Sequence, residues 1–178
     1  MGSDLQRLRT EIASAIDGIS PDDLARHTEG KWSIAEILEH LYLSYTGTVK
    51  GFERCMEQGK PLARKLVFSD FIKIFVVTKL GYFPGGRKSP KQAAPRATPA
   101  EEFLPNLSSA IAKLDETISR CEERLGKNER LLDHPILGPL TGDEWRKFHL
   151  VHGRHHLRQI RRLRQEPLAA AGVEYGGE

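Results

Sequence analysis

The feature that most constrains this chain is a run of histidines inside a strongly helical segment. Four of its seven histidines lie in the eight residues from His149 to His156. Apolar residues around them recur at helical spacing and mark the side that should face a core: Trp145, Ile160 and Leu163. Because buried imidazoles need partners, this density predicts a binding site, and a metal ion is the occupant that it favours.

Two of these histidines form a pair suited to one ion. His152 and His156 are one helical turn apart and project side by side from the core-facing side. This i, i+4 spacing lets two ring nitrogens reach one divalent ion, as in zinc-binding helices of the HExxH type. Gly153 stands where those proteases carry their general-base glutamate, so protease chemistry is not predicted. His149 lies in line with the pair and stays open as a rival ligand, whereas His155 is expected beside the site or at the surface.

A third ligand is expected from a second periodic segment, residues 33–58. His40 lies at the margin of its apolar stripe, which consists of Ile34, Ile37, Leu41, Tyr45, Thr48 and Phe52. A marginal ligand predicts a site open to solvent, with coordination positions left for water or substrate, as in catalytic metal sites. Glu36 and Glu39 flank His40, but solvation at the surface explains them equally well, so no general base is assigned.

These motifs resemble a known superfamily. Trp32 and Glu39-His40-Leu41, followed by HGRHHLRQI at residues 152–160, resemble the DinB-like (YfiT-like) superfamily of metal-binding four-helix bundles, and residues 134–149 resemble an uncharacterised branch of it. The resemblance implies an up-down-down-up four-helix bundle with a metal-binding triad, which carries over to His40, His152 and His156. It also implies chemistry of several kinds, since some members transfer low-molecular-weight thiols onto electrophiles and others are hydrolase-like or isomerase-like.

The fold expected from the pattern is all-α, with one domain over residues 1–165 and a flexible tail at 166–178. Ser3, Ser33 and Thr141 are predicted N-caps, and Gly59 and Gly126 predicted helix ends. A short extra helix should follow Ser20-Pro21, and His27 and His134 fall in connections, where we expect solvated side chains. The long helices are predicted at residues 4–16, 33–58, 98–125 and 141–165.

The connection between the second and third long helices, residues 60–97, is strongly basic. It holds nine Lys and Arg residues against Asp70 alone, in a protein whose formal net charge is +3. A basic amphipathic helix over 66–80, then a Gly- and Pro-rich loop, can cover the metal site as a lid, present an anion-binding surface, or be a solvated connection. Its aromatic residues indicate that the helix packs on something: Phe68, Phe71, Phe75, Tyr82 and Phe83. Adhesion to a membrane surface is a lesser alternative.

Several other classes are not predicted. No segment reaches the roughly 18 apolar residues of a membrane span, and no base-reading motif accompanies the basic charge, so neither an integral membrane protein nor a nucleic-acid-binding one is expected. Cys55 and Cys121 lack CxxC spacing and follow no secretory leader, which favours reduced thiols and a cytoplasmic location. A homodimer stays open as an alternative.

Two functions are compatible with these features. The first is a metal-dependent enzyme, a thiol transferase or a hydrolase, acting on an unidentified small molecule with or without a low-molecular-weight thiol. The second is a non-catalytic or regulatory module in which the ion stabilises the bundle. Three neutral imidazoles favour zinc or nickel, with iron or copper as alternatives.

Overall fold

The structure is a computed structural model that describes residues 3–27, 30–82 and 89–165. Most of these residues are helical. The all-α expectation is confirmed at this level. The expected tail at 166–178 lies outside the described residues, as does Phe83. Within the described ranges, no helix combines the length and the apolar character needed to cross a membrane.

The order of elements follows the predicted one closely. In chain order they are α1 (Asp4–Ile16), α2 (Pro21–Ala25), α3 (Ile34–Gln58), α4 (Phe68–Thr78), the 3-10 turn η1 (Lys91–Ala93), α5 (Ala100–Leu125), β1 (Leu132–His134), β2 (Gly138–Leu140) and α6 (Gly142–Gln165).

The predicted capping residues lie at the observed helix ends. The Ser3 hydroxyl accepts the Gln6 backbone N–H and begins α1. Ser33 begins α3 through a reciprocal pair, since its hydroxyl accepts the Glu36 N–H while the Glu36 carboxylate accepts the Ser33 N–H. Gly59 ends α3 at a φ of 64°, a left-handed conformation that glycine adopts without strain.

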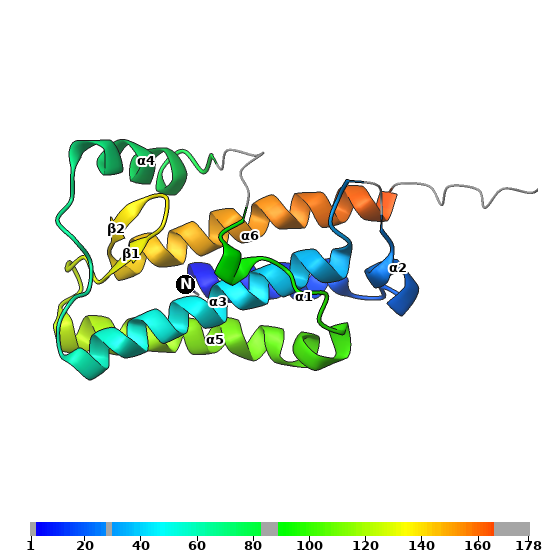
Figure 1. The fold of residues 1–178 in the computed structure, drawn as a ribbon, viewed down its shortest axis with the longest axis horizontal. Coiled ribbons are helices and arrows are strands. Elements are labelled where there is room, and N and C mark those ends of the chain that lie inside the picture. The colour runs from blue at the N-terminus through cyan, green and yellow to red at the C-terminus, as the bar shows by residue number, and fades with distance from the viewer. Residues whose placement is uncertain (1–2, 28–29, 83–88, 166–178) are drawn as a thin grey trace, which may run out of the picture.

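The four long helices lie side by side (Figure 1). In this view α1 and α6 run from left to right, and α3 and α5 run from right to left. The most extensive packing joins α3 to α5 and α1 to α6. The fully buried side chains at their centre include Leu5, Leu38, Phe52, Leu114 and Ile160. These side chains belong to one continuous apolar core between the long helices.

A short antiparallel hairpin precedes α6 and was not predicted. Leu132 of β1 pairs with Leu140 of β2, and Gly138 enters the second strand at a φ of 86°, which a side chain would strain. The indole N–H of Trp145 donates to the Leu132 carbonyl at 3.2 Å and ties the hairpin to α6. The strands are too short to show a two-residue alternation in the sequence, which is why the pattern favoured a plain connection.

Close packing of α1 on α6 requires a glycine. A Cβ on Gly153 would overlap the side chain of Leu8, which is itself fully buried. Gly47 is also helical, but a Cβ there would meet no atom within 4 Å. The two glycines therefore provide a matched pair, because only one of them lies at a helix contact.

We expect Gly153→Val to lower the free energy of unfolding by about 1–3 kcal/mol, because the added methyl groups force α1 away from α6. The control Gly47→Val should stay within about 0.5 kcal/mol of the parent, since valine is a slightly better helix former than glycine. Urea denaturation followed by circular dichroism measures both. Equal stability of the two variants would contradict this packing.

Candidate metal centre

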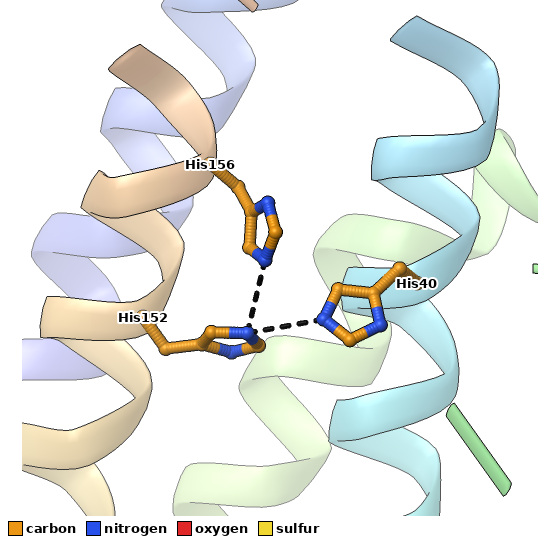
Figure 2. A group of neighbouring side chains, drawn as sticks. All are labelled: His40, His152 and His156. Atoms are coloured by element: carbon orange, nitrogen blue, oxygen red, sulfur yellow. Dashed lines mark hydrogen bonds between the residues drawn. The ribbon is translucent and has the colours of Figure 1, made fainter. Parts of the chain in front are cut away.

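Three histidine rings from two helices meet in the core. His40 projects from α3, and His152 and His156 project from α6 (Figure 2). One ring nitrogen of each lies within 4.8 Å of the corresponding nitrogens of the other two. The structure thus brings together the three residues that the sequence singled out, and all three are buried.

The spacing of the ring nitrogens matches that of ligands on one ion. The Nε2 atom of His152 lies 3.0 Å from Nε2 of His40 and 3.0 Å from Nε2 of His156. On a tetrahedral ion with bonds of about 2.05 Å, two ligand nitrogens are about 3.3 Å apart. Both of these spacings lie within a few tenths of an ångström of that value, and all three ligand nitrogens lie within 4.8 Å of one another.

Neighbouring oxygens determine which nitrogen of each ring carries hydrogen. The Nδ1–H of His40 donates to the Ala93 carbonyl at 2.7 Å, and the Nδ1–H of His156 donates to Oε1 of Gln159 at 2.7 Å. In the neutral rings, Nε2 of both residues is therefore a lone-pair acceptor. His152 can offer at most one hydrogen to these two acceptors. At least one Nε2 lone pair of the cluster therefore receives no hydrogen from the other two rings. A bound cation would satisfy it.

Burial keeps the three rings uncharged. It lowers the pKa of His156 to about 3 and the pKa of His152 well below its ordinary value, with neighbouring imidazoles adding to both effects. The pKa of His40 is lowered as well, chiefly by burial. At neutral pH the triad consists of neutral imidazoles, the form that binds divalent metals.

The site is covered, contrary to the expectation of an open rim. His40 is only 4% exposed because residues 89–98, the covering loop, fold over it. Besides the Ala93 contact, the Ser89 hydroxyl lies 3.2 Å from Nδ1 of His40, and the ring of Trp32 lies 5.3 Å away between centroids. The basic helix α4 packs on α6 and β2 instead. The part of the basic connection that covers the triad is therefore residues 89–98 of its loop.

Glu39 anchors the covering loop and is not solvated. It is 2% exposed, and its carboxylate accepts the backbone N–H groups of Arg96 and Thr98 at 3.1 and 3.2 Å and the Thr98 hydroxyl at 2.5 Å. Between these residues Ala97 adopts a φ of 58°, rare for a residue with a side chain. With Glu36 engaged at the start of α3, both carboxylates next to His40 have structural roles.

Comparison with known proteins gives a family for the chain. The sequence profile of a family described as protein of unknown function, DUF1569, matches residues 8–163. The chain belongs to the DUF1569 family. Neither the comparison with curated proteins nor that with solved structures gave a match.

The other buried histidines of this DUF1569 protein lie outside the triad. Nε2 of His149, the rival ligand, lies 3.2 Å from the Thr48 hydroxyl, and its ring stacks on Trp145. His134 is buried in β1, where its Nδ1 accepts the N–H groups of Ile136 and Leu137, so its expected solvation was wrong. The hairpin buries His134, and no periodic pattern in the sequence predicts this hairpin.

The two cysteines are free and fully buried at the other end of α3. Cys55 donates to the Leu131 carbonyl, and burial raises the pKa of Cys121 to about 11. Fifteen helical residues separate Cys55 from His40, a rise of about 22 Å. Neither thiol therefore lies near the histidine triad.

The buried His149 predicts how stability depends on pH. Its folded pKa is about 3 against an ordinary value of 6.5, so between these values the unfolded chain binds a proton that the folded chain does not. Stability is therefore lost as pH falls from about 6.5 towards 3. In chelator, His149→Gln should make the slope between about pH 4 and 6 shallower by about 1.4 kcal/mol per pH unit, measured by urea denaturation. A parental slope in His149→Gln would refute the assignment.

We also expect Glu39→Ala to release the covering loop, because two buried N–H groups lose their acceptor. Amide hydrogen exchange at Arg96 and Thr98 should accelerate at least about tenfold, and stability should fall by about 1–3 kcal/mol. Glu57→Ala, an exposed change on the same helix, is the control. Unchanged exchange at both amides would contradict the anchoring role.

Proposed function

We propose that His40, His152 and His156 bind one divalent metal ion, and that the protein is a DinB-like, up-down-down-up four-helix bundle. The observation that carries the proposal is the convergence of three uncharged imidazoles from α3 and α6, with Nε2 of His152 lying 3.0 Å from Nε2 of His40 and 3.0 Å from Nε2 of His156. The antiparallel directions of the long helices in Figure 1 support the bundle assignment. Imidazole donors favour zinc or nickel, with iron or copper as alternatives.

We further propose that the site is catalytic, as a metal-dependent thiol transferase or hydrolase in the cytoplasm. Three protein ligands support this, since structural zinc sites commonly use four and catalytic ones keep a position for water or substrate. When bound, the ion supplies a Lewis acid that lowers the pKa of water or a thiol. Because Cys55 and Cys121 are buried far from the site, a reacting thiol must come from a small molecule.

The chain's own groups would then hold the ligands rather than move protons. The Ala93 carbonyl and the Gln159 amide oxygen keep hydrogen on Nδ1 of His40 and His156, which presents both Nε2 lone pairs to the centre. Trp32 and the covering loop exclude water from the same side. Since Glu36 and Glu39 are engaged elsewhere, no carboxylate of α3 is assigned as a general base.

One observation favours the second candidate, a non-catalytic site in which the ion stabilises the bundle. The three rings are only 4–7% exposed, so a bound ion would lie in the core and join α3 to α6. In that case binding free energy adds directly to folding stability.

Metal titration tests the step that both candidate functions share, namely the binding of one divalent ion by the triad. Elemental analysis and calorimetry with Zn²⁺ and Ni²⁺ should give one ion per chain, and alanine at any of the three histidines should weaken binding by at least about 100-fold. Gln159→Ala should weaken it by about 10- to 100-fold. His27→Ala, an exposed histidine outside the triad, is the control. Freshly purified protein without metal that also fails to bind either ion would exclude the proposal.

Chelation separates the two candidates. For an enzyme, removing the ion should abolish turnover in a screen of thiols with electrophiles and of hydrolysable esters, while the melting temperature falls by only a few degrees. For a stabilising ion, the melting temperature should fall by about 10 °C, with no turnover in either state.

A further inference from the structure

An unusual apolar surface lies away from the metal centre, on α4 and the residues that flank it. In the described ranges, the large apolar side chains that are exposed all belong to residues 66–82. Phe68 is 80% exposed and Phe71 56%. The others are Leu66, Val67, Ile72, Phe75, Leu80 and Tyr82. Scattered exposed apolar residues are normal, but a continuous patch of aromatic and aliphatic side chains marks an interaction site.

The helix α4 has two apolar faces, and the protein covers only one. Ile74, Val77 and Thr78 are buried, and α4 packs on α6 and β2. The opposite face consists of side chains at i, i+3, i+4 and i+7 spacing: Phe68, Phe71, Ile72 and Phe75. Figure 1 shows α4 along the outside of the molecule, above the hairpin and α6.

The border of this surface is positively charged. Residues 60–82 contain five basic residues and a single acidic one, Asp70. Asp70 is 1% exposed and is neutralised by Arg64, at 2.6 Å, and Lys73, at 3.5 Å. Lys60, Lys65 and Lys79 are exposed. Lys65 and Lys79 thus flank the exposed apolar face of α4, and residues 60–82 carry no exposed carboxylate.

We infer that residues 60–82 bind the surface of an anionic lipid bilayer. The outward phenylalanines and Ile72 enter the boundary between headgroups and acyl chains, while the lysines extend to lipid phosphate and carboxylate groups. A helix of 11 residues is too short to span a bilayer, so the protein lies on the membrane.

Charge decides between a bilayer and a second copy of this chain. A two-fold dimer through α4 would place the same cationic border against itself, and like charges facing each other oppose association. An anionic bilayer meets the border with opposite charge and the centre with hydrocarbon. Aliphatic side chains such as Val67, Ile72 and Leu80 suit hydrocarbon better than they suit the stacked bases of a nucleic acid.

Vesicle sedimentation with the full chain tests the inference. The protein should sediment with vesicles of phosphatidylcholine mixed with phosphatidylserine, weakly or not at all with phosphatidylcholine alone, and less as salt rises. The double variant Phe68→Ser, Phe71→Ser should bind at least about tenfold more weakly. The pair Lys65→Gln, Lys79→Gln should bind about 30-fold more weakly. The matched control, Lys50→Gln with Lys127→Gln, removes the same charge elsewhere and should change binding less than about twofold.

The inference fails if the protein binds neither vesicle, or binds both equally, at low salt. It also fails if Phe68→Ser, Phe71→Ser binds as the parent does. Concentration-dependent dimerisation in sedimentation velocity that this variant abolishes, without vesicle binding, would assign the surface to a second copy. Binding to polyglutamate alone would assign it to an acidic protein. All variants change exposed side chains, so melting curves should match the parent and exclude unfolding as the cause.

Discussion

Burying three uncharged imidazoles between α3 and α6 is the constraint on which much of this structure depends. Rings in that position need hydrogen-bond partners, and two of them find oxygens outside the cluster, on Ala93 and Gln159. The Ala93 carbonyl reaches His40 only because residues 89–98 cross the surface of α3, and Glu39 fixes that crossing by accepting two backbone N–H groups. Satisfying one buried ring thus determines the path of a whole loop.

The covering loop also bears on whether an ion bound by the triad would be catalytic or stabilising. The covering loop closes the triad on the side of His40, so if the proposed site is catalytic its substrate would have to enter while residues 89–98 are displaced or from a side that they do not cover. The two N–H bonds to Glu39 hold the loop closed, and Ala97 between them adopts a left-handed conformation that is costly for a residue with a side chain. A catalytic site would need this loop to open, whereas a purely structural site would need only the closed form.

The helix boundaries could be predicted because capping residues act locally. The burial of the site residues could not, because it depends on contacts with distant segments of the chain. Ser3, Ser33 and Gly59 act on backbone within a few residues, so their roles can be inferred from the sequence. The histidine pair follows from helical spacing in the same way. Burial of His40 and Glu39 depends on a loop more than fifty residues away, and burial of His134 depends on a hairpin with no clear period. The sequence therefore predicted His40 and His134 to be nearer to solvent than they are in the structure.

The separation of the ligands along the chain has a consequence for biosynthesis. His40 and His152 are 112 positions apart, so the first ring leaves the ribosome long before its partners exist. During that interval α3 exposes an imidazole whose final neighbours are still to be translated. The triad is assembled only as the last helix joins its neighbours, and a nascent chain that stalls before residue 152 lacks two of the three rings.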